Sequence, residues 1–133
     1  MKIWLNGCFD VLHHGHFRMI QHATSFGGQV MIGIDSDKRV KELKGDQRPF
    51  HNEKERLFNL KQIKGVDTVV VFDSDEMLEE YIKRFSPDKF IIGSDYLGKK
   101  IIGSEYAKQV VIFDKIEKFS TTNIFNYDNN NNR

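Results

Sequence analysis

The chain has 133 residues, 39% of them hydrophobic and 29% charged, and its net charge is +1. These values exclude a disordered or fibrous protein, and they exclude bulk charge as the basis for binding nucleic acid or an anionic membrane. The length predicts one domain with a core of its own. Cys8 is the only cysteine, which excludes an intrachain disulfide and a four-cysteine zinc site. The chain has neither an apolar run long enough to span a membrane nor an N-terminal signal peptide, so we expect a cytoplasmic protein.

The first half of the chain alternates apolar runs with helical patterns. Residues 2–7 predict a strand that ends in a turn at Asn-Gly, and residues 15–26 carry apolar side chains at near-helical spacing. The next expected elements are a buried strand at 30–34, a helix at 37–43 capped within residues 35–37, a loop at 44–51, and a helix that Asn52 caps and Gly65 ends.

The second half continues the alternation. We expect a strand at 68–72, a helix through 77–85 that Pro87 closes, a strand at 90–92, a short helix at 104–108, a strand at 110–113 and a helical turn or two at 121–127. The strands are continuous apolar runs, which is typical of a parallel sheet covered on both faces. With right-handed crossovers this predicts a single Rossmann-like α/β domain at 1–127, with a doubly wound, mostly parallel five-stranded sheet and helices on both faces. The Asn-rich residues 128–133 are expected to be a disordered tail.

Histidines cluster where the first strand meets the first helix, in the segment GCFDVLHHGH at residues 7–16. A helix N-terminus presents free N–H groups and the positive end of the helix dipole, and both suit phosphate. Gly15 lets the backbone approach a ligand, and imidazole N–H groups donate to phosphate oxygens. A helix cap with surface histidines is the alternative. A zinc site on His13 and His16 is a weaker interpretation than phosphate binding, because no third ligand lies at a recognisable spacing.

Residues 7–16 resemble the G-x-F-D-x-x-H-x-G-H signature of the cytidylyltransferase-like nucleotidyltransferases, and the resemblance extends from Ile3 to about Phe125. Residues 43–49 (LKGDQRP), 93–96 (GSDY), 102–105 (IGSE) and 120–124 (STTNI) resemble motifs of the bacterial enzymes that activate heptose 1-phosphate as a nucleoside diphosphate sugar. The glycerol-3-phosphate cytidylyltransferases share the first and last motifs but fit the middle of the chain less well. The chain departs from these patterns at Ile92, Lys115 and Lys118.

The resemblance implies nucleotidyl transfer, in which a phosphorylated acceptor attacks the α-phosphorus of CTP or ATP in line and pyrophosphate leaves. It implies catalytic roles for His13, His16 and Lys44, whereas His14 occupies a variable position. It also implies a nucleotide-binding set of Gly7, Cys8, Phe9, Gly15, Arg48, Arg56, Gly93, Asp95, Ser120, Thr121 and Thr122. Asp10 and Lys115 are assigned to the acceptor side, although a structural turn role for Asp10 is equally open.

Other interpretations of these residues remain. Lys44 and Arg48 are also typical of solvated loop cations, and Arg56 of a helix-face charge paired with Asn52 or Glu53. The segment at 93–95 also fits an ordinary turn, and Ser120 a simple N-cap.

The expected partners are the triphosphate and a small phosphorylated acceptor, with Mg²⁺ bound chiefly through phosphate oxygens and no dedicated metal cage. The resemblance also implies a homodimer. Nucleic acid and membranes are not expected partners. The runner-up functions are cytidylyl transfer to glycerol 3-phosphate and, in another class, a non-catalytic nucleotide-binding module. A dinucleotide-binding oxidoreductase is disfavoured, because no G-x-G-x-x-G follows the first strand.

Overall fold

A computed structural model describes residues 1–96 and 98–114. The strands are β1 (Lys2–Gly7), β2 (Gln29–Asp35), β3 (Thr68–Phe72), β4 (Lys89–Gly93) and β5 (Gln109–Phe113). The helices are α1 (His14–Thr24), α2 (Asp37–Lys44), α3 (Glu53–Lys61) and α4 (Asp75–Phe85), with short 3-10 helices η1 (Ser94–Tyr96) and η2 (Ser104–Tyr106). None of these helices is both long and apolar enough to cross a bilayer. The predicted helix at 121–127 and the predicted tail at 128–133 lie outside the described residues.

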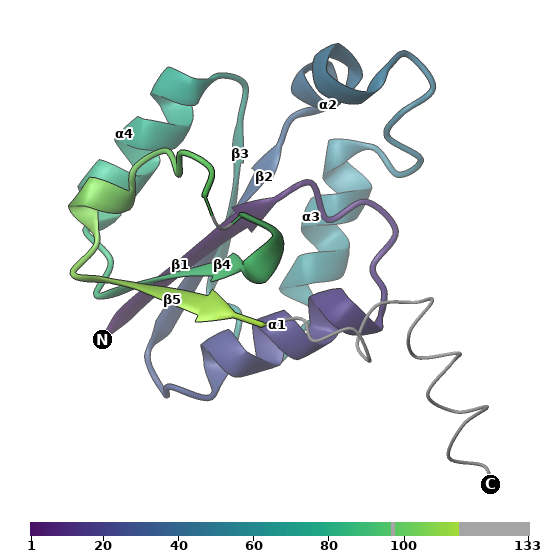
Figure 1. The fold of residues 1–133 in the computed structure, drawn as a ribbon. Helices are drawn as coiled ribbons and strands as arrows, with labels where there is room; N and C mark the ends of the chain where they lie inside the picture. The colour runs from purple at the N-terminus through teal and green to yellow at the C-terminus, as the bar shows by residue number, and fades with distance from the viewer. Residues whose placement is uncertain (97, 115–133) are drawn as a thin grey trace, which may run out of the picture.

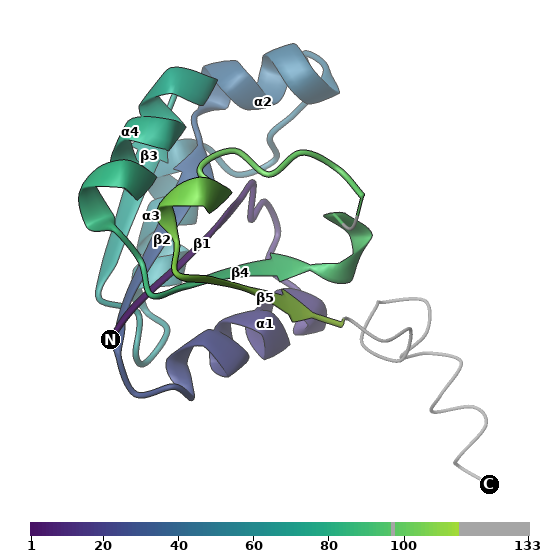
Figure 2. The same cartoon turned by 60° about the vertical axis from the view of Figure 1, so that its left-hand side comes forward.

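The strands form one parallel sheet in the order β3-β2-β1-β4-β5. The chain runs from β1 outward to β3, crosses back, and adds β4 and β5 on the other side of β1. Right-handed crossovers in opposite directions use opposite faces of a sheet, so α1 and α3 cover one face and α4 covers the other (Figure 1). The second view shows α1 and α4 separated by the sheet (Figure 2). The prediction of a doubly wound, Rossmann-like α/β domain is confirmed.

Each face of the sheet carries its own apolar core, and β1 contributes to both. Ile3 and Leu5 belong to the cluster under α1 and α3, whereas Trp4 belongs to the cluster under α4. This follows from the alternation of side chains along a strand. The indole of Trp4 lies 6.3 Å from the Phe85 ring and over Gly33 of β2, where an added Cβ would come within 2.7 Å of Trp4 Cζ2. Gly33 therefore leaves the space that the indole fills.

Side-chain caps fix where most of the helices begin. The oxygens of Ser36, Asn52 and Ser74 each accept a backbone N–H from the third residue of the helix that follows. The predicted cap regions at 35–37 and at Asn52 are thus confirmed. Such a cap contributes roughly 1 kcal/mol, because it satisfies a donor that has no partner within the helix. The N-cap of helix α1 is His13, whose side-chain contacts are described with the site below.

One expectation of burial is wrong. The sequence predicts buried strands throughout, but β5 is the edge strand beside β4, and Val110 and Ile112 are 38% and 47% exposed. On α3, Phe58 is 61% exposed, because the helix packs on the sheet through other residues such as Leu60.

Candidate active site

A cleft opens at the carboxyl edge of the sheet between β1 and β4. Strand β1 pairs with β2 at six positions but with β4 at only two, Ile3–Lys89 and Trp4–Phe90. Beyond those pairs β1 and β4 separate, and a cleft of about 810 Å³ lies at their ends. The order of the strands reverses at this point, and such a crevice is the usual ligand site of an open α/β sheet.

The cleft brings together most of the residues that the sequence predicts for the site. Ten of them line it: Gly7, Cys8, Phe9, Asp10, His13, His16, Lys44, Arg48, Gly93 and Asp95. The sequence predicts Lys44 as the first residue of the loop at 44–51, but it is the last residue of α2. Gly15 is buried in the first turn of α1. The predicted Lys115, Ser120, Thr121 and Thr122 lie outside the described residues.

The two motif histidines cap α1 and stack on each other. Nδ1 of His13 accepts the Gly15 N–H at 3.0 Å, and Nδ1 of His16 accepts the His13 N–H at 3.2 Å. The two ring centroids are 3.9 Å apart with an interplanar angle of 24°, and the Phe9 ring lies 5.3 Å from His16. His13 is therefore both a helix cap and a residue of the cleft, so the two interpretations of this motif are compatible.

These backbone contacts decide where the imidazole protons lie. A nitrogen that accepts a hydrogen bond carries no proton, so each neutral ring bears its proton on Nε2. The two Nε2–H groups become a pair of donors whose positions are set by the helix terminus. A donor held in place beforehand stabilises developing phosphate charge without first having to reorganise.

The loop between β1 and α1 has a strained backbone. Phe9 and Val11 adopt φ angles of 51° and 47°, the left-handed region that residues other than glycine rarely occupy. Each such residue costs roughly 1–3 kcal/mol and persists only where its surroundings hold it. Two sets of contacts hold this backbone in place. Phe9 is buried in the core cluster, and the carboxylate of Asp10, which lies between Phe9 and Val11, accepts two backbone N–H groups.

Asp10 ties the histidine loop to the loop that precedes α3. Its carboxylate accepts the N–H groups of Phe50 at 2.7 Å and His51 at 2.9 Å, and Arg48 Nε lies 3.4 Å away. Burial alone would raise the pKa of Asp10, but the hydrogen bonds from His51 and Phe50, with the Arg48 charge, hold that pKa below its ordinary value. Asp10 lines the cleft with its oxygens already engaged, which favours the structural role over contact with the acceptor.

Arg56 lies outside the cleft. The family resemblance assigns it to the nucleotide, but its side chain is 0% exposed and does not line the cleft. Its guanidinium donates to the carbonyl oxygens of His51 (2.9 Å), Cys8 (3.0 Å) and Asp35 (2.7 Å), and pairs with Asp37 Oδ1 at 2.9 Å. Arg56 therefore joins the loops that follow β1 and β2 to the start of α3, and it positions the site without touching it.

The alternative partners suggested for Arg56 have other roles. Asn52 caps α3, and Glu53 Oε1 accepts the Asp37 N–H at 2.9 Å. The ion pair of Arg56 is thus made across the fold and not along its own helix.

The sequence missed part of the cleft on its β2 and β4 sides. Asp35 lines the cleft and pairs with Arg39 at 2.8 Å, and Arg39 also pairs with Asp75 at 2.6 Å. Tyr96 lines it as well, and burial, followed by the charges of Asp95 and Asp35, raises the pKa of its phenol, which stays an O–H donor. Asp35 ends β2 at the carboxyl edge of the sheet, and that position was the signal by which it could have been found.

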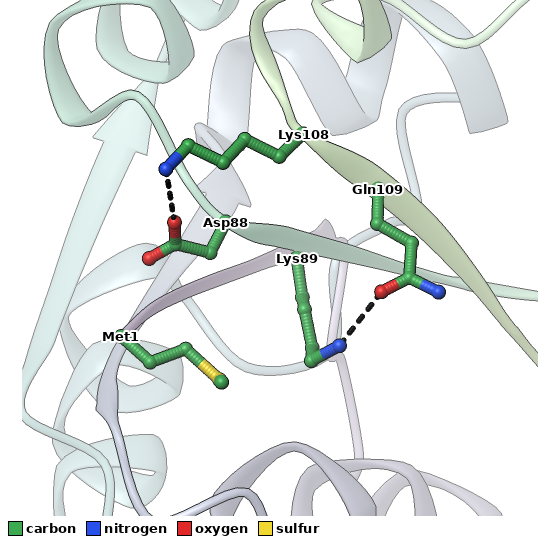
Figure 3. Close-up of a pocket in the computed structure, with 5 residues that line it drawn as sticks. All are labelled: Met1, Asp88, Lys89, Lys108 and Gln109. Atoms are coloured by element: carbon green, nitrogen blue, oxygen red, sulfur yellow. Dashed lines mark hydrogen bonds and ion pairs between the residues drawn. The ribbon is translucent and has the colours of Figure 1, made fainter.

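A second hollow lies at the amino ends of the strands, lined by Met1, Asp88, Lys89, Lys108 and Gln109 (Figure 3). Lys108 Nζ pairs with Asp88 Oδ1 at 3.2 Å, and Lys89 Nζ donates to Gln109 Oε1 at 2.7 Å. These polar groups satisfy one another, and none of the motif residues is among them. The carboxyl-edge cleft is therefore the candidate active site.

Within the described ranges, no group of three or more His, Cys, Asp or Glu side chains is arranged to hold a metal ion.

Comparison with known proteins agrees with this geometry. Residues 4–128 match the cytidylyltransferase-like family. The bifunctional protein HldE of Campylobacter fetus subsp. fetus (strain 82-40) is 44% identical over 124 residues, covering 93% of this chain and 27% of that protein. HldE of Helicobacter pylori (strain P12) is 43% identical over 122 residues, covering 92% of this chain and 26% of that protein.

The chain thus spans about a quarter of the length of these curated relatives. The crystal structure of the lipopolysaccharide core biosynthesis protein from Thermoplasma volcanium GSS1 superposes with a TM-score of 0.71 at 20% identity, covering 86% of this chain and 96% of that chain. At that identity the superposition supports the fold. Together with the motif residues gathered in the cleft, the family match shows that this chain belongs to the cytidylyltransferase-like family.

Proposed function

We propose that this chain is a nucleotidyltransferase that transfers a nucleotidyl group from a nucleoside triphosphate to a phosphorylated sugar resembling heptose 1-phosphate. The observation that carries the proposal is the pair of stacked imidazoles whose Nδ1 atoms are held by the start of α1 at the edge of the cleft. Family membership and the identity to the HldE proteins support the same class of reaction.

The reaction needs no covalent enzyme intermediate. An oxygen of the acceptor phosphate forms a bond to the α-phosphorus, and the bond from that phosphorus to the bridging oxygen breaks. Pyrophosphate leaves with the electron pair. The Nε2–H groups of His13 and His16 donate to phosphate oxygens, and Lys44 adds positive charge from the end of α2. Catalysis then consists of positioning and charge stabilisation.

Mg²⁺ would enter on the triphosphate. The carboxylate of Asp10 is occupied by two backbone N–H groups, and that of Asp35 by Arg39, so these two side chains have little capacity left for a cation. Asp95 also lines the cleft. This donor set fits a metal held mainly by phosphate oxygens, where its charge would offset that of the leaving pyrophosphate.

The test is a matrix of the four ribonucleoside triphosphates against heptose 1-phosphate and glycerol 3-phosphate, read as phosphate after pyrophosphatase. The proposal expects release with heptose 1-phosphate and with ATP or CTP. Release with glycerol 3-phosphate alone would favour the alternative cytidylyltransferase. Triphosphate binding without release from any pair would identify a non-catalytic nucleotide-binding module.

The proposed assembly is a homodimer. Exposed aromatic side chains on α1 and on α3 offer apolar surface for it: Phe17 and Phe58. Light scattering at several protein concentrations measures the mass, and a monomer at every concentration would contradict this part of the proposal.

A further inference from the structure

The positive charges that line the cleft are not equally available to a ligand. Arg39 and Arg48 each pair with a described carboxylate. Lys44 and Lys100 also line the cleft, and neither forms an ion pair with any carboxylate in residues 1–96 or 98–114. Lys44 already has a role in the proposed function, whereas Lys100 has none.

The two lysines come from opposite sides of β1. Lys44 ends α2, which follows β2, and Lys100 lies between η1 and η2, after β4. Strands β2 and β4 are the two neighbours of β1 in the sheet, so the two segments reach the cleft from opposite walls. Two cations on opposite walls can bracket an anion that lies over the end of β1.

The backbone after Lys100 is anchored. Ile101 and Ile102 pack against the apolar cluster under α4. Gly103, with φ of 84°, lies so close to α4 that an added Cβ would come within 2.6 Å of Ile82 Cδ1. Lys100 is therefore attached to a segment that the core holds, which limits where its ammonium group can lie.

The neighbouring lysine behaves differently. Lys99 Nζ lies 5.8 Å from the centre of the Tyr96 ring, and Lys99 is not among the residues that line the cleft. Lys99 and Lys100 thus share a charge, a loop and an exposed position, but only Lys100 lines the cleft. This difference supplies a matched control.

We propose that Lys100 binds a substrate phosphate from the β4 side of the cleft, opposite Lys44. The inference rests on the proposed function, because it takes the ligand to be a phosphorylated substrate. Ile91, Ile92 and Ile101 also line the cleft, and apolar walls strengthen the attraction between an ammonium group and an anion. The phosphate belongs either to the triphosphate or to the acceptor, and both present the same anionic oxygens.

The experiment compares wild type with Lys100→Ala, Lys100→Arg and Lys99→Ala by calorimetry. ATP, CTP, heptose 1-phosphate and glycerol 3-phosphate are titrated one at a time, with no second substrate present. Losing a charge-assisted contact is expected to weaken binding roughly tenfold. Lys100→Ala should show that loss for one class of ligand, and which class it is identifies the phosphate that Lys100 contacts. Lys100→Arg should recover most of the affinity, and Lys99→Ala should bind like wild type.

The proposal is overturned if Lys100→Ala binds every one of these ligands as tightly as Lys99→Ala does. Circular dichroism of each variant confirms that it is folded. Because binding is measured without turnover, the two proposals fail separately. A wild type that binds a triphosphate but releases no pyrophosphate contradicts the proposed function, while the comparison of variants still decides the role of Lys100. A wild type that binds none of the four compounds contradicts both.

Discussion

His13 combines two roles that one substitution can separate. Its Nδ1 caps α1 by accepting the Gly15 N–H at 3.0 Å, and its Nε2 is the proposed phosphate donor. In His13→Asn the amide oxygen takes the place of Nδ1, and nothing replaces Nε2. In His13→Ala both groups are lost.

The magnitudes differ enough to distinguish the roles. Losing one preorganised donor lowers turnover by a factor of about 10²–10³, so the turnover of both variants should fall by at least about a hundredfold. Losing an N-cap costs about 1 kcal/mol, which lowers Tm by about 4 °C in a domain of this size. Asn is among the best N-cap residues, so His13→Asn should melt within about 2 °C of wild type.

Turnover is measured as pyrophosphate release and Tm by scanning calorimetry. His14→Ala is the control, since His14 is not among the residues that line the cleft, and it should keep wild-type turnover. If His13→Asn turned over as fast as wild type, the assignment of Nε2 would be wrong. If it melted as low as His13→Ala, the cap would not explain the stability of α1.

Four more substitutions test the rest of the site. His16→Ala should lower turnover about a hundredfold in the pyrophosphate assay, and a folded variant with unchanged turnover would contradict its role. Lys44→Ala should lower kcat/KM about tenfold while Tm stays within about 1 °C, because an exposed side chain contributes little to the core; a large fall in Tm would instead indicate a structural role. Asp10→Asn should lower the free energy of unfolding, measured by urea, by about 1–3 kcal/mol. An amide has only one oxygen, so one of the two backbone N–H groups, that of Phe50 or that of His51, loses its acceptor. The pKa of Asp10 lies below its ordinary value in the folded protein. The stability that the ionised carboxylate contributes should therefore be lost as the pH falls through that lowered pKa, and Asp10→Asn should not show this loss. Arg56→Met should lower the free energy of unfolding by roughly 3 kcal/mol or more, because it removes a buried cation and leaves Asp37 and three carbonyl oxygens without their partner. A decrease of less than about 1 kcal/mol would contradict its positioning role.

Local signals in the sequence are enough to predict the helices and strands and to locate the candidate site. Apolar runs marked the strands, and Asn52 marked the start of α3. The phosphate-binding motif could be located because a strand end and a helix start are adjacent in the chain, which is the arrangement found around His13 and His16.

The remaining errors come from contacts between distant residues. Arg56 lies 48 residues from Cys8 and 21 from Asp35, and nothing in its local sequence reveals either contact. An apolar run such as 110–113 also does not reveal whether its strand lies at the centre or the edge of a sheet. Lys100 has no local signal either, because two adjacent lysines in a loop look alike until the fold places one of them in the cleft.

A crystal structure of the protein with a non-hydrolysable triphosphate tests the central claim most directly. The account predicts phosphate oxygens within hydrogen-bond distance of Nε2 of both His13 and His16, while each Nδ1 keeps its backbone donor. A triphosphate bound elsewhere, for example at Lys89 and Lys108, with both imidazoles away from it, would contradict the account.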